Sequence, residues 1–440
     1  MTHARRIAIR NTIIDWLLGG ALALLLLSGA HAGTPVAVPH ATPAAIAFAQ
    51  HRQPLWLAAQ LLPILIAFLV LVTGLGARLR SLCARLAGGN WFWTVTLFAC
   101  AYVFVAALIV APFDYYRDIV DLRAFGQSAP SPVQWFAGEA VGLVAKLVVT
   151  GLFVWIPYAL IAKSPCRWWL YSSLALIPVV FLVLVAIPVW VDPLTTSYQP
   201  LADTSLAAKI EALAARCGVS HIPVFVGGNE DTVVGLGPTN RIILDKDLFK
   251  TETPDQVGFT GGHELKHYVE MDNWKALAII VCLLFAGFFL VDRIGRWWIA
   301  RGARFFGFDD LADPASLPLI IVILGVCWLA VSPLLNLYSR HIEHEADRFG
   351  LELTHENHAM AEIFANEVTL HDEPAEWDTL FLIFRANHPS RADRIRFAND
   401  YHPWEDGKPL VYGNVCKPEA SGIGNSAAVA SFPGSAPRQL

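Results

Sequence analysis

Seven apolar stretches, each close to the length needed to cross a bilayer, constrain the fold more than any other feature of this sequence. A transmembrane helix needs about 20 apolar residues. Only 16% of the 440 residues are charged, whereas a soluble domain carries about 25%. The sequence therefore predicts an α-helical multi-pass membrane protein that has the lipid bilayer as a partner. The candidate spans are residues 13–30, 55–74, 91–111, 138–161, 168–189, 274–291 and 317–334.

The first apolar stretch has a second interpretation. Arg5, Arg6 and Arg10 precede it, and the small-residue motif Ala30-His31-Ala32 follows it. This pattern is also typical of a cleaved secretory signal peptide. The stretch is therefore either a span or a signal peptide, and in both cases the next loop is exported.

The orientation follows from the short loops, because Lys and Arg accumulate on the cytoplasmic side of a membrane protein. The pattern predicts that residues 191–273 and everything after 338 lie outside, which in a bacterial inner membrane is the periplasmic side. The net charge is -5, and the sequence has no cluster of basic residues of the kind that binds nucleic acid, so no nucleic-acid partner is expected. One side carries Arg5, Arg6, Arg10, Arg78, Arg80, Arg85, Lys163, Arg167, Arg293, Arg296, Arg301 and Arg304, and the other carries Arg52, Arg117 and Arg123.

A zinc-peptidase motif, HELKH, lies just before the sixth span. If residues 263–267 are helical, His263 and His267 share one face, and Glu264 lies beside them to handle a proton. The sequence of residues 253–256, Thr-Pro-Asp-Gln, predicts a helix start with a capping box. A catalytic zinc needs three protein ligands, so this motif requires a third ligand from elsewhere.

The third ligand is expected after the seventh span, because two crossings return the chain to the same side. There the sequence of residues 339–347 is SRHIEHEAD. Asn273 occupies the position, six residues beyond His267, at which a metzincin carries its third His. The residues that compete for the third position are His341, Glu343, His344 and Glu345.

The two motifs together resemble those of the type I CAAX prenyl proteases, a family of membrane zinc metallopeptidases with bacterial heat-shock relatives. The resemblance implies a gluzincin-type site with one Zn²⁺ per chain, held by His263, His267 and Glu343. It also implies that Glu264 is the general base that deprotonates a zinc-activated water. The expected activity is hydrolysis of a peptide or protein substrate by a metalloendopeptidase.

Further site residues follow from the same resemblance. Asp347 lies one turn beyond Glu343, where it could accept a hydrogen bond from a ligating His, and Arg340 could pair with a carboxylate. The alternative for these two is an ordinary surface ion pair. In the later segment 387–394, His388 resembles a donor to the oxyanion and Arg394 follows it. The alternative there is the start of a surface helix.

A small β-hairpin subdomain is expected between the fifth and sixth spans. Residues 222–226 and 241–244 are typical of strands, and their edge could bind an extended peptide. The sequence departs here from the family, which carries an Asn-Ala pair on that strand. Counting back from Gly235 places Glu230 where the family has Asn, with Asn229 one residue early. Substrate binding is therefore expected to differ from that of prenyl proteases.

The sequence leaves several questions open. Glu139 and Lys146 share a helix face and face either a water-filled chamber or the interface. Cys217 and Cys416 could form a disulfide on the exported side. The alternatives to a processing protease are a quality-control protease, a transporter and a non-catalytic scaffold.

The sequence predicts five segments. They are 1–192 with spans one to five, 193–273 with the HELKH helix, 274–337 with spans six and seven, 338–415 with the third ligand, and a disordered tail at 416–440.

Overall fold

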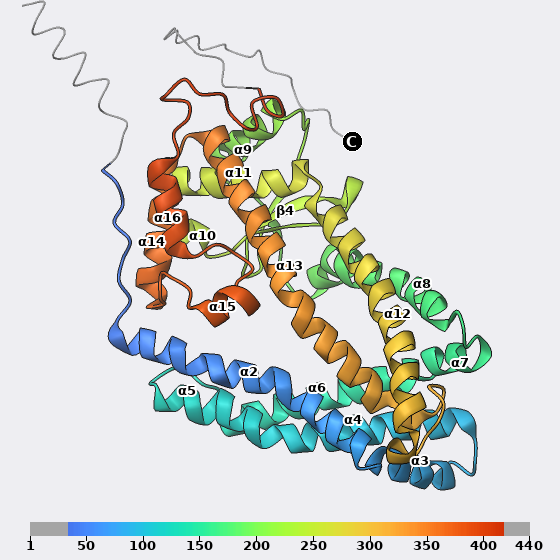
Figure 1. Cartoon of the computed structure of the whole chain (residues 1–440). Coiled ribbons are helices and arrows are strands. Elements are labelled where there is room, and N and C mark those ends of the chain that lie inside the picture. Colours follow the sequence, from blue (N-terminus) through green and yellow to red (C-terminus); the bar gives the residue numbers. More distant parts are fainter. Residues whose placement is uncertain (1–33, 418–440) are drawn as a thin grey trace, which may run out of the picture.

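The computed structural model describes residues 34–417, and long helices dominate it (Figure 1). Six segments of this part are long and apolar enough to cross a membrane; five contain the predicted stretches from the third to the seventh, and the first overlaps the second stretch, which was predicted to run two residues further, to Gly74. The stretch at 13–30, with its two interpretations, lies outside the described residues. The six segments are Pro43–Val72, Trp91–Ala124, Pro132–Lys163, Trp168–Leu194, Asp272–Phe306 and Pro314–Thr354.

Each membrane segment consists of one or more helices. Two of them contain π-helical turns, η1 (Tyr116–Val120) and η2 (Leu182–Val191), and η2 includes Pro188. The helices of this part are α2 (Pro43–Val72), α3 (Leu75–Leu86), α4 (Trp91–Tyr115), α5 (Asp121–Ala124), α6 (Pro132–Phe153), α7 (Trp155–Lys163), α8 (Trp168–Phe181), η3 (Asp192–Leu194), α12 (Asp272–Phe306), η5 (Pro314–Ser316) and α13 (Leu317–Thr354).

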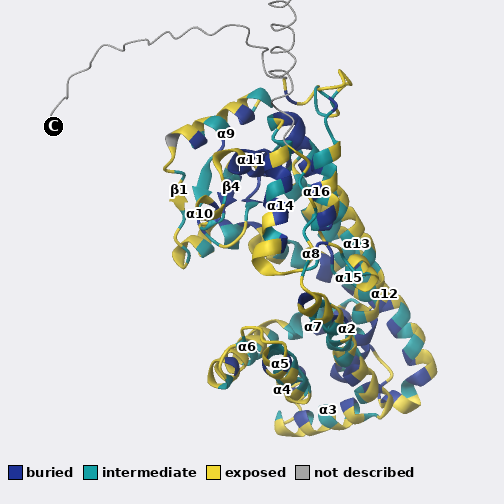
Figure 2. Cartoon of the chain, turned by 90° about the vertical axis from the view of Figure 1, so that its left-hand side faces the viewer, coloured by how far each residue is buried: buried dark blue, intermediate teal, exposed yellow. Residues whose placement is uncertain are grey.

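A second part of the chain carries shorter helices and a small sheet. Buried residues gather around α11 and α14 there, whereas α4, α5 and α6 expose much of their surface (Figure 2). Its elements are β1 (Gln199–Pro200), α9 (Thr204–Arg216), β2 (Val224–Val226), β3 (Thr232–Val234), η4 (Gly237–Thr239), β4 (Arg241–Leu244), α10 (Leu248–Thr251), α11 (Pro254–Val269), α14 (Asn357–His371), α15 (Thr379–Phe384) and α16 (Arg391–Asp400).

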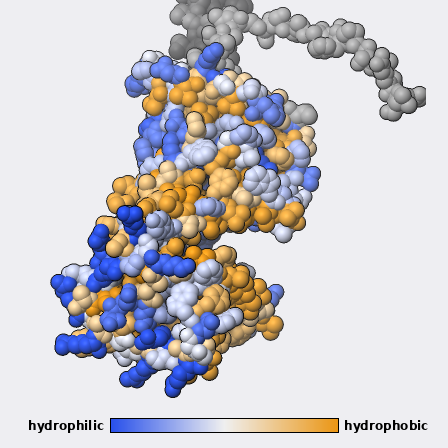
Figure 3. Space-filling view, turned by 90° about the vertical axis from the view of Figure 1, so that its right-hand side faces the viewer, coloured by the Kyte–Doolittle hydropathy of each residue, from blue (hydrophilic) through white to orange (hydrophobic). Residues whose placement is uncertain are grey.

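Helices α12 and α13 join the two parts. In Figure 1, α12 leaves the end of α11 and runs to the far end of the molecule, and α13 returns from there to cross α11. This return brings segments about eighty residues apart in sequence into contact. Figure 3 shows an apolar band across the middle of one face, with hydrophilic side chains gathered at the far end.

The helix α11 is packed on both sides. Its capping box forms as predicted, because Thr253 Oγ1 accepts from Gln256 N and Gln256 Oε1 accepts from Thr253 N. Its glycines allow neighbours to approach closely. A Cβ on Gly261 would lie 3.0 Å from Ile210 of α9, and one on Gly262 would lie 3.2 Å from Thr354 of α13.

The sheet differs from the predicted hairpin. Its order is β1-β2-β4-β3, and β2 pairs with β4 in parallel, so the two predicted strands do not form a hairpin with each other. The antiparallel hairpin is β3–β4, with Val233 opposite Ile242. The physical reason is that the segment between β2 and β4 contains an additional strand, which occupies the antiparallel place beside β4.

Two other expectations have a structural outcome. Cys217 and Cys416 are joined by a disulfide, which ties the end of α9 to the C-terminal segment. Glu139 and Lys146 are both exposed on α6, and no ion pair joins them within the described residues. The chamber is therefore still only a prediction.

Candidate metal centre

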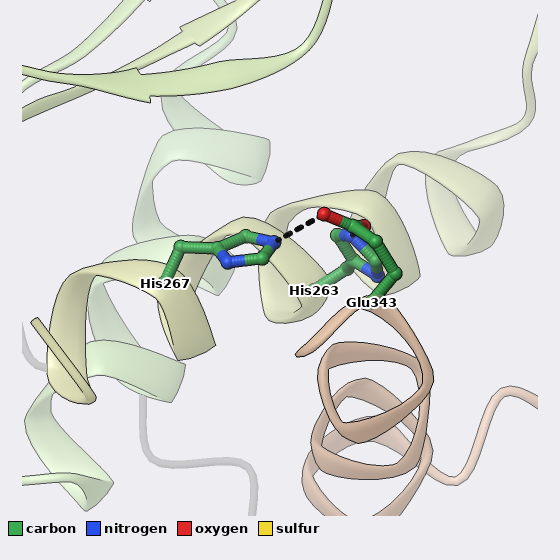
Figure 4. Close-up of side chains that lie close together, drawn as sticks. All are labelled: His263, His267 and Glu343. Atoms are coloured by element: carbon green, nitrogen blue, oxygen red, sulfur yellow. Dashed lines mark hydrogen bonds and ion pairs between the residues drawn. The ribbon is translucent and has the colours of Figure 1, made fainter. Parts of the chain in front are cut away.

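Two histidines on α11 and one glutamate on α13 meet where the helices cross (Figure 4). Each of His263, His267 and Glu343 offers one ligand atom, and the three atoms lie within 4.8 Å of one another. Nε2 of His263 lies 3.2 Å from Oε2 of Glu343, and Nε2 of His267 lies 3.8 Å from its Oε1. The helical spacing of the histidines and the return of α13 together create this group.

The second nitrogen of each imidazole is held by a carboxylate. Nδ1 of His263 lies 3.0 Å from Oδ1 of Asp347, and Nδ1 of His267 lies 2.9 Å from Oδ2 of Asp272. Carboxylates at this position fix the ring orientation and tautomer of ligating histidines. Both Nε2 atoms are therefore directed toward Glu343.

The carboxylates of Asp347 and Glu343 favour a positive charge on His263. Burial lowers the pKa of His263, but hydrogen bonds to Asp347 and Glu343 outweigh this effect and raise it to about 10. Ligands of a tetrahedral zinc at about 2.0–2.1 Å lie roughly 3.3 Å apart, close to the separations of 3.2 and 3.8 Å found here. The two-His, one-Glu donor set therefore fits a catalytic zinc.

Glu264 is buried beside His263, and no donor of the described residues reaches its carboxylate. Asp231 is close enough to Glu264 to feel its charge. Burial, together with the charges of Glu264 and Asp245, raises the pKa of Asp231 to about 7, against a hydrogen bond from Asp245 N that lowers it. No hydrogen bond within the described residues therefore occupies the Glu264 carboxylate beside the metal group.

Other residues of the late motifs lie around this group. Asp347 is fully buried, and Arg394 of α16 donates to it through Nε at 2.8 Å. Nε2 of His388 lies 3.3 Å from Oε2 of Glu343. Among the described residues Arg340 pairs with no carboxylate, contrary to expectation; its Nη1 donates instead to the carbonyls of Leu382 at 2.6 Å and Ala386 at 2.5 Å. It thereby holds the segment that leads to His388.

The competing ligands on α13 face elsewhere. Glu345 accepts from Arg348 and Tyr412, and the His344 ring packs against Phe397. Neither these two residues nor His341 belong to the metal-binding group that the described residues form.

The residues expected on the edge strand flank it instead. Asn229 and Glu230 are exposed in the loop before β3, and Asn229 accepts from Lys246. Gly235 follows β3 directly with φ of +94°, and a Cβ there would lie 2.4 Å from the carbonyl oxygen of Thr239. The sharp turn after β3 therefore requires glycine.

Sequence reasoning missed two residues that support the metal group. Lys266 is almost fully buried within the HELKH motif, and its Nζ donates to Asp272 at 2.7 Å and to the carbonyl of Ile342 at 3.2 Å. Asp272 also holds His267. The available signal was an acidic residue five positions after His267, at the start of the next helix.

Known proteins resemble both parts of the chain. Residues 200–402 match the model of peptidase family M48, and residues 44–196 match the N-terminal region of CAAX prenyl proteases, with five membrane helices. The uncharacterized metalloprotease YhfN of Bacillus subtilis is 27% identical over 338 residues, which cover 75% of this chain and 79% of that protein. The CAAX prenyl protease 1 homolog of Dictyostelium discoideum is 25% identical over 312 residues, which cover 66% of this chain and 69% of that protein.

A shorter sequence match and a solved structure also resemble this chain. The protease HtpX homolog of Bacillus licheniformis is 26% identical over 220 residues, which cover 47% of this chain and 71% of that protein. The crystal structure of S. mikatae Ste24p has the same fold, with a TM-score of 0.65 at 19% identity, covering 81% of this chain and 88% of that chain. The chain is therefore a multi-pass membrane metallopeptidase that is similar to peptidase family M48 in its second half and to the CAAX prenyl proteases in its N-terminal helices.

Proposed function

We propose that this metallopeptidase is a zinc endopeptidase, with one Zn²⁺ held by His263, His267 and Glu343. The observation that carries the proposal is the convergence of three donor atoms within 4.8 Å, with each imidazole oriented by its own carboxylate. When bound, zinc supplies Lewis acidity toward a water molecule and the scissile carbonyl.

The surrounding residues perform the proton transfers and the positioning. Glu264 takes the proton from the attacking water and passes it to the leaving amine. His388 donates a hydrogen bond to the developing oxyanion, and its Nε2 lies near Glu343 in support of this role. Asp347 and Asp272 hold the two imidazoles, and Arg394 holds Asp347.

The active site faces the exported side of a bacterial inner membrane in this proposal. The charge pattern supports it, because the loops and helix ends remote from the metal group are basic. Cytoplasmic loops are enriched in Lys and Arg. These residues are Arg78, Arg80, Arg85, Lys163, Arg167, Arg293, Arg296, Arg301 and Arg304.

The substrates in this proposal are proteins that reach the metal group as an extended segment. Both processing and quality-control proteases would use this site, and they differ only in their substrates. A Glu264→Gln variant traps uncleaved substrates and separates the two possibilities. A few defined partners indicate processing, and many damaged membrane proteins indicate quality control.

Zinc content and cleavage of an unfolded protein test the proposal together. Wild-type protein purified in detergent should carry about one zinc per chain. Glu264→Gln should keep the zinc and lose cleavage, and Glu343→Ala should lose both. Glu345→Gln is a matched control on the same helix and should keep both. Absence of zinc in carefully prepared wild type, or full activity of Glu264→Gln, would refute the proposal.

A further inference from the structure

A groove follows the line where helices α2, α13 and α15 meet. In Figure 1, α15 lies above α2 and beside α13. Two cavities lie along this line, with volumes of about 320 and 350 Å³, and ligand sites typically measure about 300–1,000 Å³. Both cavities are lined by Gln60, Trp328 and Leu329, so they form one continuous groove.

The groove is apolar at one end and polar at the other. The cavity further along the membrane helices is lined by apolar side chains such as Ile64 and Leu324. The second cavity is lined by Ser332, Asn336 and Arg385 as well as by aromatic rings. A ligand that fits this groove therefore has an apolar tail and a polar head.

The polar end lies where two membrane helices leave the hydrocarbon. The apolar stretch of α2 begins at residue 55, and that of α13 ends at residue 334. Trp56 and Asn336, which line the polar cavity, lie at these two ends. Tryptophan is enriched at the boundary between hydrocarbon and water. The polar end of the groove is therefore at the level of the lipid headgroups.

The Arg385 guanidinium at this end is held by aromatic rings and has most of its N–H groups unused. Its Cζ lies 5.7 Å from the ring centre of Trp56 and 4.7 Å from that of Phe381. Among residues 34–417, its one hydrogen bond runs from Nη1 to Oε1 of Gln53, at 3.2 Å. Arginine N–H groups in this state can bind a phosphate through two parallel hydrogen bonds.

The positive charge of Arg385 is not balanced by an ion pair within residues 34–417. Burial and the nearby charge of Arg52 lower the pKa of Arg385, and the charge of Asp378 opposes this only in part. Arg52 has its own carboxylate partner, Asp121, at 3.2 Å. An anion at the polar end of the groove would therefore supply the charge that Arg385 lacks.

We propose that this groove binds an anionic phospholipid, with the phosphate on Arg385 and an acyl chain between α2 and α13. Charge complementarity selects this occupant, because the phosphate balances the arginine and the chain fills the apolar cavity beside Ile64. A zwitterionic lipid carries the same phosphate but adds a cation close to Arg385 and Arg52, so it binds less tightly. The site is separate from the metal group and does not depend on the proposed zinc chemistry.

Native mass spectrometry of the full-length protein in dodecyl maltoside tests the polar end. Wild type should bind phosphatidylglycerol about tenfold more tightly than phosphatidylcholine, and Arg385→Gln should lose this preference, because an interaction with a charged group accounts for about that factor. Arg385→Lys keeps the charge and should retain the preference in part. A wild type without the preference has only non-specific lipid around it, which would overturn the proposal.

Arg123→Gln is the matched control. Arg123 is exposed, its side chain donates to the carbonyl of Pro130 at 2.9 Å, and it lines neither cavity. This variant should therefore keep the preference for phosphatidylglycerol. An equal loss in Arg123→Gln and Arg385→Gln would show that surface charge alone attracts the lipid, and would also overturn the proposal.

A substitution in the apolar cavity tests the place of the acyl chain. Ala59→Phe puts a ring into this cavity and should weaken binding of phosphatidylglycerol about tenfold. Leu61→Phe, at a side chain that is 44% exposed on the same helix and outside both cavities, should not. Glycerol 1-phosphate, which has no acyl chain, should not compete. Competition by glycerol 1-phosphate would assign the site to free phosphate, and displacement of the lipid by β-casein would assign it to substrate; either result would overturn the proposal.

Discussion

Arg394 donates from Nε to Oδ2 of Asp347 over 2.8 Å, and Oδ1 of the same carboxylate lies 3.0 Å from Nδ1 of His263. Three helices, α16, α13 and α11, are therefore connected through one fully buried carboxylate. The Asp347 carboxylate requires both partners, because a buried charge without compensation is costly.

The first prediction concerns this connection. Arg394→Met should weaken zinc binding about tenfold to a hundredfold, because Asp347 loses the partner that holds it against His263. It should also lower the free energy of unfolding by about 3 kcal/mol, since Asp347 becomes a partly uncompensated buried charge. Competition with a zinc chelator and chemical denaturation measure the two effects.

Arg396→Met is the control for that prediction. Arg396 lies on the same helix, but it is 52% exposed and pairs with the exposed Glu376. Surface pairs contribute at most about 1 kcal/mol, so this variant should resemble wild type in both measurements. Equal effects of the two substitutions would show that Asp347 does not depend on Arg394.

The second prediction concerns Lys266, whose ammonium group joins Asp272 to the carbonyl that precedes Glu343. Lys266→Met keeps the apolar stem and removes both hydrogen bonds. Unfolding free energy should fall by about 1–3 kcal/mol, and zinc affinity should fall because the distance between α11 and Glu343 is less well fixed. Isothermal titration with zinc and denaturation measure these changes.

Lys275 provides the comparison for Lys266. It donates to Oδ1 of the same Asp272 at 3.0 Å, but it is 41% exposed, and its other hydrogen bond within the described residues goes to Glu270 rather than to α13. Lys275→Met should therefore have a clearly smaller effect on zinc affinity. A larger effect for Lys275→Met would contradict the proposed role of Lys266.

Much of the fold and of the metal group could be predicted from the sequence, because both depend on strong local patterns. The apolar stretches give the spans, and helical spacing places His263 and His267 on one face. The choice of Glu343 over its neighbours needed the family resemblance, since spacing alone left His341, His344 and Glu345 open.

The features that could not be predicted from the sequence depend on contacts between distant segments. The order of the strands was wrong because β3 has only three residues and its place beside β4 is set by packing rather than by pattern. Arg340 binds backbone carbonyls, which have no sequence signal. Nδ2 of Asn273 donates to the carbonyl of Val233 on β3, and this contact requires the left-handed turn at Met271, which a methionine does not indicate.

The third prediction concerns the disulfide between Cys217 and Cys416, which closes a loop across 199 positions. Cys416→Ser should lower the free energy of unfolding by about 2–4 kcal/mol, because the cross-link restricts the unfolded chain. Cys166→Ser, at an exposed free cysteine, is the control and should have little effect. Thermal unfolding with and without reductant measures this. Insensitivity of the wild type to reductant would indicate that the bond does not form.

The last prediction is a pH dependence that originates in Glu252, which lies close to Asp231 and accepts from Thr260 Oγ1 at 3.4 Å. Burial, with the charges of Asp231 and Glu367, raises the pKa of Glu252 from 4.5 to about 8. The folded state therefore holds this proton more tightly than the unfolded state. By linkage, the free energy of unfolding falls as pH rises from about 4.5 to about 8.

Glu252→Gln removes this titration, so its melting temperature should fall less than that of wild type over the same pH range. Below about pH 4.5 the two proteins should differ little, because the wild-type side chain is then neutral in both states. Glu211→Gln, at a side chain that is 53% exposed, is the control and should follow wild type. Parallel curves for wild type and Glu252→Gln would show that Glu252 ionises as readily in the folded protein as in the unfolded chain.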